Sequence, residues 1–226
     1  MLEFKPKLNS ARIDDQIIND LIEFIFVNKD FQGFTLTFLG DWKKTINNKN
    51  ELGSKIEQSL RYDDIKNSSK KDEFIITLGD FYDTTEKSLE HRRGQALEEI
   101  WNRIGPWNSE VNGAQPIFEA MVWHDNVKLS ESDIDFAYQN NKAIEIDECK
   151  ASAKNTVLHG ISERTKSKYT LMVNTKNLGT QEGINTEAYI ITLDSSTQPT
   201  KSLLRRHGFN DSLKILCRKD LKDKLV

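Results

Sequence analysis

Hydrophobic residues recur at helical spacing in two long segments of the chain. Between Ile17 and Ile25, within residues 13–26, the apolar positions follow a period close to 3.6 residues. A second helical pattern runs from Thr84 to Ile104 and ends at Gly105-Pro106, a pair that stops helices. Shorter helices are predicted over residues 51–60, 155–166 and 201–206.

Other segments alternate apolar and polar residues, or are uniformly apolar, as β-strands are. The clearest is residues 143–150 (AIEIDECK), which follows residues 133–138 (DIDFAY) after a short link containing Asn140-Asn141. Because Asn tolerates positive φ, the two segments are predicted to form a tight hairpin. Further strands are predicted over residues 34–39, 74–78, 117–123, 169–173, 188–193 and 213–217, and a polar loop over residues 63–72.

Helices and strands that alternate in this way predict an α/β fold with a mixed central sheet flanked by helices. Residues 84–226 contain most of the predicted strands and are expected to form the main domain. Residues 1–83 are expected to form an N-terminal α/β extension or subdomain.

Composition excludes several classes of protein. The 226 residues are 37% hydrophobic and 30% charged, which is enough apolar material for a core, and the net charge of -3 excludes a polybasic nucleic-acid binder. Two cysteines, Cys149 and Cys217, exclude a disulfide framework or a Cys-rich zinc fold. No signal-peptide pattern and no long apolar stretch is visible, so we expect a soluble, cytoplasmic protein with no membrane partner.

The predicted hairpin gathers charged residues on one face. If Asn140-Asn141 is a two-residue turn, Asp133 lies opposite Glu148, and alternation places both on the same face as Asp135 and Lys150. Carboxylates packed this closely repel one another unless a cation lies between them, and Mg²⁺ or Mn²⁺ suits such ligands. A neighbouring lysine can orient a water molecule and stabilise charge on a phosphate.

These residues resemble the PD-(D/E)xK, restriction-endonuclease-like nuclease superfamily. Glu148-Cys149-Lys150 is similar to its acid-x-Lys motif and is followed by Ala-Ser, as in many members. Asp135 would be the first acid, in an Asp-Ile-Asp-Phe setting that lacks the proline of the family's name. Arg93 to Glu98 (RGQALE) is similar to a Lys-Gly-x-x-aromatic-Glu run on a preceding helix, with Arg for Lys and Leu for the aromatic residue.

The resemblance covers residues 86–218 in element order and implies a restriction-endonuclease-like core. It implies an endonuclease that uses Mg²⁺ or Mn²⁺ to hydrolyse phosphodiester bonds, with duplex DNA as the expected substrate. Restriction, repair or anti-phage defence would be the setting, with a homodimer or a partner protein of such a system as further expectations.

Roles for individual residues follow from the same resemblance. Asp135 and Glu148 would hold the metal, with Asp133 as an alternative to Asp135 and the Cys149 carbonyl as a further ligand. Lys150 would position the attacking water, and Glu98 would complete the outer metal shell or a second ion.

Two alternatives remain open at this point. One is a binding module for nucleic acid or protein that keeps the fold without turnover. The other is an RNA endonuclease, in which His91, seven residues before Glu98 on the same helical face, would bind metal as in nucleases of segmented negative-strand viruses.

Several charged residues have a plainer interpretation beside the functional one. Lys154, Arg93 and Arg164 are candidate contacts to nucleic acid, although solvated helical charge is the default for such residues. Glu145 and Asp147 alternate away from Glu148 and are expected to face solvent or a helix.

Overall fold

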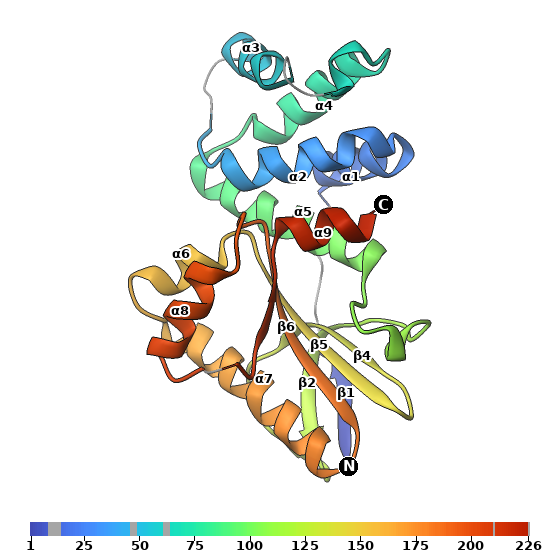
Figure 1. The fold of residues 1–226 in the computed structure, drawn as a ribbon, viewed down its shortest axis with the longest axis vertical. Coiled ribbons are helices and arrows are strands. Elements are labelled where there is room, and N and C mark those ends of the chain that lie inside the picture. The colour runs from blue at the N-terminus through green and yellow to red at the C-terminus, as the bar shows by residue number, and fades with distance from the viewer. Residues whose placement is uncertain (9–14, 46–48, 61–63, 210, 226) are drawn as a thin grey trace.

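One open, seven-stranded sheet flanked by helices organises the chain, which is a mixed α/β structure (Figure 1). The computed structural model describes residues 1–8, 15–45, 49–60, 64–209 and 211–225. Residues 13 and 14 of the predicted helix 13–26 and residue 63 of the predicted loop 63–72 lie outside the described residues.

The sheet has the strand order β1-β2-β4-β5-β6-β7, and β3 pairs with β2 outside this path. The pairs β1–β2, β2–β3, β2–β4 and β4–β5 are antiparallel, whereas β5–β6 and β6–β7 are parallel. The strands are β1 (Leu2–Pro6), β2 (Ile117–His124), β3 (Val127–Lys128), β4 (Ile134–Gln139), β5 (Ala143–Lys150), β6 (Asn185–Thr192) and β7 (Lys214–Leu216). The sheet therefore changes from antiparallel to parallel at β5, which has hydrogen-bonded neighbours on both sides.

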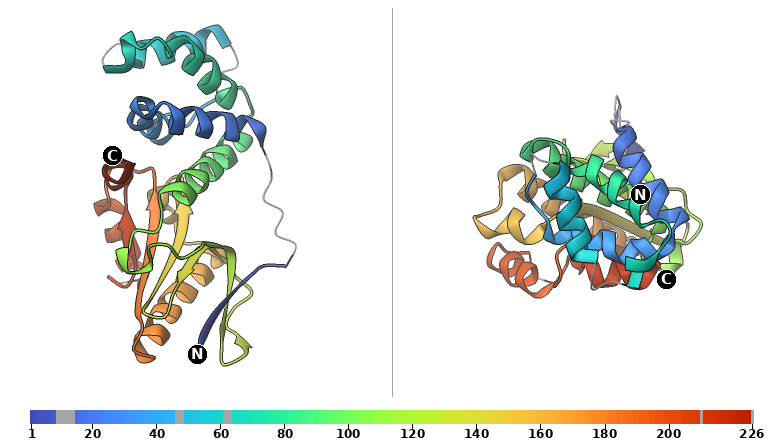
Figure 2. Two further views of the ribbon diagram at one scale, coloured as in Figure 1. Left: turned by 90° about the vertical axis from the view of Figure 1, so that its right-hand side faces the viewer. Right: turned by 90° about the horizontal axis from the view of Figure 1, so that it is seen from above.

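Helices lie at one end of the sheet and along one of its faces. Figures 1 and 2 show the N-terminal helices stacked beyond α5 and α9, away from the strands. This group contains α1 (Gln16–Val27), α2 (Gln32–Asp41), α3 (Lys49–Leu60), α4 (Lys71–Tyr82), α5 (Glu86–Ile104) and α9 (Arg218–Leu225), with short 3-10 turns at Lys29–Phe31, Asp64–Asn67 and Ser109–Val111. The second group, along the sheet, contains α6 (Ala153–Leu158), α7 (Glu163–Gln181) and α8 (Gln198–Arg206).

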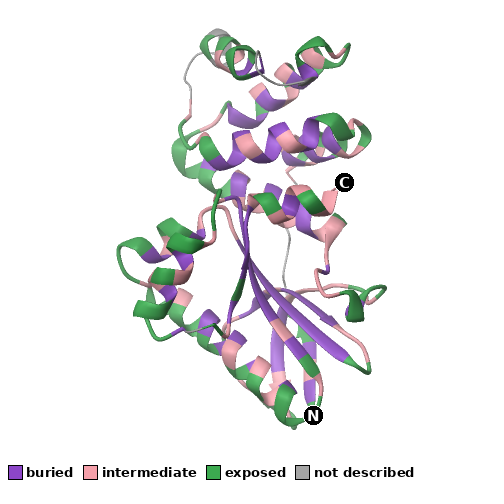
Figure 3. Cartoon of the chain, viewed as in Figure 1, coloured by how far each residue is buried: buried purple, intermediate pink, exposed green. Residues whose placement is uncertain are grey.

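Two hydrophobic clusters hold these layers together. One joins the N-terminal helices and α5 to one face of the sheet, with Trp101 and Phe136 fully buried in it. The other joins the opposite face to α7 and α8, with Ile146 and Met172 fully buried. Figure 3 shows the resulting continuous burial of the central strands. Each face of β5 is thus covered by a different group of helices.

Three predicted strands are helical in the structure. Residues 34–39 lie in α2, residues 74–78 in α4 and residues 169–173 in α7. In α2 nearly every residue from Phe34 to Gly40 is buried, and a fully buried helix cannot be distinguished from a buried strand by its period. The strands predicted within the N-terminal α/β extension are therefore wrong. The regular structure described from residue 16 to residue 82 is helical, and β1 belongs to the main sheet.

The remaining predicted elements are present, with shifted ends. Helices 13–26, 51–60, 84–104 and 201–206 correspond to α1, α3, α5 and α8, and strands 117–123, 133–138, 143–150, 188–193 and 213–217 correspond to β2, β4, β5, β6 and β7. The predicted helix 155–166 is divided between α6 and α7, because Gly160 interrupts it with a φ of 103°. The polar segment 63–72 contains a 3-10 turn and the start of α4 rather than a continuous loop. Strands β1 and β3 and helix α9 have no counterpart among the predicted elements. The boundary between two domains at residue 83 stays a prediction.

Among the described residues, no helix combines the length and the apolar composition that crossing a bilayer requires.

Candidate functional site

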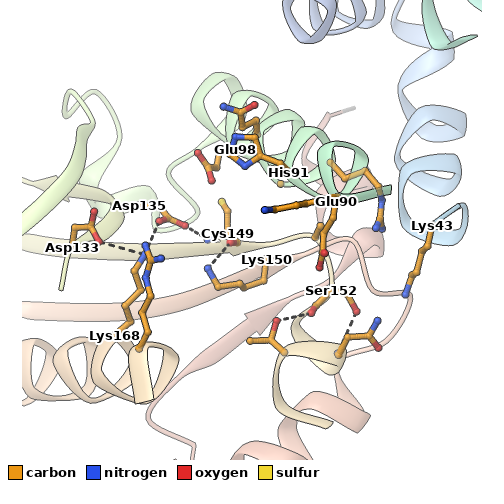
Figure 4. Close-up of a pocket in the computed structure, with 18 of the residues that line it drawn as sticks. Lys43, Glu90, His91, Glu98, Asp133, Asp135, Cys149, Lys150, Ser152 and Lys168 are labelled. Carbon is orange, nitrogen blue, oxygen red and sulfur yellow. Dashed lines mark hydrogen bonds and ion pairs between the residues drawn. The ribbon is translucent and has the colours of Figure 1, made fainter. Parts of the chain in front are cut away.

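A cleft of about 1080 Å³ opens where β5 ends. One wall is α5, the opposite wall is formed by α6 and the beginning of α7, and the ends of β4 and β5 lie between them (Figure 4). The candidate metal-site and catalytic residues Glu98, Asp133, Asp135, Cys149 and Lys150 line this cleft. Glu148 lies directly beneath it and is fully buried.

The hairpin that supplies these residues has a different register from the one predicted. Phe136 lies opposite Asp147, whereas an Asn140-Asn141 turn would place it opposite Glu145. The reason is the side chain of Asn140, whose Oδ1 accepts hydrogen bonds from the backbone N–H groups of Lys142 and Ala143 at 2.8 and 3.0 Å. Asn140 thus begins the turn instead of lying within it.

A register error of two residues leaves every side chain on its predicted face. Continued by one residue, the observed ladder brings Asp135, rather than Asp133, level with Glu148. The Oδ2 atom of Asp135 also accepts a hydrogen bond from the backbone N–H of Cys149 at 2.8 Å. Asp135 is therefore fixed against the strand that contains the acid-x-Lys motif.

Asp133 has a different environment from Asp135. Its Oδ2 atom accepts a hydrogen bond from Lys7, just after β1, at 3.0 Å. Burial alone would raise the pKa of Asp133, but the ammonium groups of Lys168 and Lys7 outweigh it and the pKa is lowered. Because Lys7 already neutralises Asp133, the geometry favours Asp135 as the partner of Glu148.

Lys168 is a charged residue at this site that the sequence analysis did not select. It lies on α7, is only 8% exposed, and donates hydrogen bonds to Glu148 Oε1 and Oε2 at 2.9 and 3.0 Å and to Asp135 Oδ1 at 3.1 Å (Figure 4). Helical spacing could have identified it, because Lys168 shares the buried face of α7 with Leu171, Met172 and Thr175. The strand predicted over residues 169–173 concealed that periodicity.

Lys150 approaches the same carboxylates from the cleft. Its Nζ donates to Glu148 Oε1 and to the Cys149 carbonyl oxygen, the latter at 3.1 Å, and its side chain remains 26% exposed. Burial disfavours the charge on both lysines, but Glu148 and Asp135 outweigh it, so the pKa values of Lys150 and Lys168 are raised. Both side chains are therefore ammonium ions at neutral pH.

Glu148 is subject to opposing influences. Burial and the nearby Asp135 carboxylate raise its pKa, while the ammonium groups of Lys150 and Lys168 counteract that rise. The site is thus a group of three carboxylates whose mutual repulsion is offset by lysines.

Helix α5 presents Glu98 and His91 to the cleft, and both line it (Figure 4). The helix begins where the Thr85 hydroxyl accepts a hydrogen bond from the N–H of Ser88. Arg93 also borders the cleft but is only 4% exposed, and its Nε donates to the Leu39 carbonyl oxygen at 2.6 Å. Arg93 therefore joins α5 to α2 through its Nε, while its Nη2 is buried without a hydrogen-bond partner among the described residues.

The remaining basic candidates differ in position. Arg164 is exposed and lines the cleft, whereas Lys154 is exposed but is not among the lining residues. Lys43 and Lys87, which the sequence analysis did not select, are exposed cations at the cleft. Positive charge consequently reaches the rim from the segment after α2, from α5 and from α7.

The opposite face of β5 corrects one expectation. Glu145 and Asp147 are fully buried, so the expectation that they face solvent is wrong. The expectation of a contact with a helix is correct for Asp147. Asp147 Oδ2 accepts a hydrogen bond from Trp101 Nε1 of α5 at 2.8 Å. Glu145 accepts hydrogen bonds from the backbone N–H groups of Trp107 and Asn108 at 2.7 and 2.5 Å.

A separate cluster of potential metal ligands lies outside the cleft. One ligand atom from each of His124, Asp125 and Glu182 lies within 4.8 Å of the others. The α-amino group of Met1 already contacts Asp125 and lies 2.9 Å from Glu182. None of the three residues lines the cleft, and the ammonium group of Met1 offsets their charge.

The carboxylates in the cleft have the properties of a cation site. Oxygen atoms of Asp135 and Glu148 converge within 3.1 Å of one ammonium nitrogen, which occupies the place of a cation between them. Carboxylate and carbonyl oxygens are the ligands that Mg²⁺ and Mn²⁺ prefer, and the Cys149 carbonyl oxygen accepts a hydrogen bond from Lys150 beside them. The residues therefore fit the divalent ion that the sequence resemblance implies.

Comparisons with known proteins add no assignment. No protein-family model matches the chain, and no significant similarity to a curated protein was found.

Proposed function

We propose that this protein is a nuclease that uses Mg²⁺ or Mn²⁺ to hydrolyse phosphodiester bonds, as its resemblance to the PD-(D/E)xK superfamily implies. The observation that carries the proposal is the convergence of Asp135, Glu148 and Lys150 at the end of β5, beneath an open cleft. A pair of carboxylates, of which Glu148 is fully buried and Asp135 lines the cleft, meets the requirements of metal-assisted hydrolysis when a lysine lies beside it.

Each side chain has a role that follows from its position. Asp135 and Glu148 would hold the ion, with the Cys149 carbonyl oxygen as a further ligand. A divalent ion bound there would polarise the phosphate and make a water molecule more acidic. Lys150, which is partly exposed to the cleft, would orient that water and stabilise negative charge on the phosphate. Glu98, on the other wall, would complete the outer shell of the ion or bind a second one.

DNA is the proposed substrate, and the rim of the cleft supports binding of a nucleic-acid backbone. Lys43, Lys87 and Arg164 are exposed there and come from three separate segments of the chain. Cations at such a rim suit phosphate contacts, which position a nucleic acid without reading its sequence. Restriction, repair or anti-phage defence remains the proposed biological setting.

RNA is the second candidate substrate, because His91 lines the cleft on the same helix as Glu98. A histidine so placed could serve as a metal ligand, as in the RNA-cleaving relatives of the superfamily. If RNA is the substrate, His91→Ala should reduce cleavage together with metal affinity. If DNA is the substrate and His91 is a solvated side chain, neither should change.

Cleavage assays with Mg²⁺ and with Mn²⁺ test the proposal. Duplex DNA, single-stranded DNA and single-stranded RNA are incubated with wild-type protein and with Asp135→Asn, Glu148→Gln and Asp133→Asn. We expect cleavage of one of these substrates, its loss in the first two variants, and a smaller effect of Asp133→Asn because Lys7 already neutralises Asp133. Binding of nucleic acid without cleavage under any condition would favour the binding-module alternative.

A further inference from the structure

Lys168 occupies the position between the two carboxylates that a metal ion would need. Its ammonium nitrogen is 2.9 and 3.0 Å from the oxygens of Glu148, 3.1 Å from Asp135 Oδ1 and 3.7 Å from Asp133 Oδ1 (Figure 4). An ammonium group has three donors and no acceptor, and here three carboxylates surround it. The contact is therefore a saturated, buried ion cluster rather than a surface ion pair.

The packing of α7 determines where this ammonium lies. Gly179, nearly three turns after Lys168, rests directly on β6, where an added Cβ would be 2.0 Å from Thr186 Oγ1. Leu171, Met172 and Thr175, on the same buried face, anchor the helix between these points. Because the helix is fixed against the sheet, Lys168 can leave the carboxylates only by a change of its own side-chain rotamer.

A divalent ion and this ammonium cannot share the position. Mg²⁺ needs carboxylate oxygens at about 2.0–2.1 Å, so an ion bound to both Asp135 and Glu148 would lie in the space that the Lys168 nitrogen fills. Two cations at that separation repel strongly, and the ammonium would also lose its acceptors.

Lys150 does not present the same obstacle. It contacts Glu148 and the Cys149 carbonyl oxygen but does not bridge Asp135 and Glu148. Its side chain is 26% exposed, so it can turn toward the cleft.

We propose that Lys168 is an internal cation that competes with the divalent metal for Asp135 and Glu148. The ammonium keeps the two carboxylates together when no metal is bound, and it withdraws when the metal enters. Lys168 thereby lowers the affinity of the site for metal and acts as an autoinhibitory contact. This inference rests on the proposed function, because it concerns the same carboxylates.

Calorimetric titration with Mn²⁺ alone tests the competition. Lys168→Met removes the charge with little change in length, and we expect it to bind Mn²⁺ about tenfold more tightly than the wild type. Lys168→Arg keeps the charge and should show no such gain. Lys176→Met is the matched control, because it removes a lysine from the same helix whose partner is Glu187, and its Mn²⁺ affinity should equal that of the wild type.

Thermal unfolding provides a second measurement that does not depend on activity. Without metal, Lys168→Met removes one of the two ammonium partners of the fully buried Glu148 and should melt below the wild type. Mn²⁺ should raise its melting temperature more than that of the wild type. Lys168→Gln, which keeps a polar side chain without the charge, is measured in parallel, so that a folding defect in one variant leaves the other to decide.

The outcomes separate the two proposals. Unchanged or weaker Mn²⁺ affinity in Lys168→Met and Lys168→Gln would overturn the competition. If wild-type protein still bound Mn²⁺ and lost it in Glu148→Gln, the proposed metal site would stand. No Mn²⁺ binding by the wild type or by any Lys168 variant would instead contradict the proposed function itself.

Discussion

The two faces of β5 carry acidic residues in very different surroundings. On the cleft face, Glu148 is paired with the ammonium groups of Lys150 and Lys168. On the other face, the donors to Glu145 and Asp147 among the described residues are all neutral. Two backbone N–H groups donate to Glu145, and the Trp101 indole donates to Asp147. All three acids are fully buried and lie within four consecutive residues.

The difference lies in what each face can exchange with its surroundings. On the cleft face, ammonium groups counteract the repulsion between the carboxylates, and one cation there can be replaced by another. Burial raises the pKa values of Glu145 and Asp147, and the neighbouring Glu145 carboxylate raises that of Asp147 further. One face is therefore suited to bind a metal, and the other joins the strand to α5 and the segment that follows it.

The largest expected effect concerns Lys150, on the cleft face. Lys150→Ala should retain metal binding, because Asp135 and Glu148 remain, yet should reduce cleavage about 10²-fold or more. The loss follows from removing the group that orients water and stabilises charge on the phosphate. Single-turnover cleavage in Mg²⁺ and in Mn²⁺ measures the rate, and calorimetry with Mn²⁺ measures the binding.

Lys150→Arg provides the control for charge. A planar guanidinium that is always protonated does not replace a compact ammonium, so we expect no recovery of cleavage. Wild-type rates in Lys150→Ala would mean that the assigned residues are not those that cleave.

A change on the opposite face should affect stability rather than cleavage. Trp101→Phe removes the indole N–H that donates to Asp147 Oδ2, and the loss of this donor to a buried carboxyl oxygen costs about 1–3 kcal/mol of unfolding free energy. Urea unfolding measures that cost, and the folded variant should cleave at the wild-type rate.

The same substitution at Trp107 separates the hydrogen bond from the loss of ring volume. Trp107 contacts Glu145 through its backbone N–H, which Trp107→Phe retains, so this variant should lose less stability than Trp101→Phe. Equal losses would show that packing, and not the contact with Asp147, is responsible.

The smallest expected effect is a pH dependence of stability. The pKa values of Glu145 and Asp147 are raised in the folded protein, so their protonated forms stabilise it. This contribution to the free energy of unfolding is complete below the ordinary carboxyl pKa of about 4, and it is lost as the pH rises through the raised pKa values. The Glu145→Gln/Asp147→Asn double variant has no carboxyl group to ionise at either position. Its melting temperature, recorded without divalent ions, should decline less with rising pH than that of the wild type.

Glu187 gives a control of opposite sign on the same sheet. Burial would raise its pKa, but hydrogen bonds from Lys214 and Lys176 outweigh that effect and the pKa is lowered. The contribution of Glu187 to the free energy of unfolding is present above the ordinary carboxyl pKa and is lost as the pH falls through the lowered pKa. Glu187→Gln should therefore differ from the wild type at neutral pH and approach it in acid. Melting-temperature differences of the same sign for the two variants would contradict the opposite pKa shifts of these carboxyl groups.

Much of the sheet could be predicted from the sequence, because its strands are short, apolar and bounded by turn residues. The hairpin of β4 and β5 was found by alternation, and its register was wrong by two because the capping role of the Asn140 side chain cannot be read from composition. The error did not change which residues share a face, since that depends only on odd and even positions.

The rest of the site could not be predicted, because it depends on contacts between distant segments. Lys168 is twenty residues beyond Glu148 and reaches it only through the packing of α7 on β6. Lys7 pairs with Asp133 across more than a hundred residues and thereby distinguishes Asp133 from Asp135. The pattern of residues 34–39 in α2 predicts a strand, since a helix that is buried on nearly all sides has no distinctive period.

A crystal structure of the protein soaked in Mn²⁺, with the ion located by its anomalous scattering, tests the central claim most directly. We expect an anomalous peak bridging Asp135 and Glu148, with the Lys168 ammonium displaced from between them. No peak in the cleft, or a peak only at His124, Asp125 and Glu182, would contradict the account.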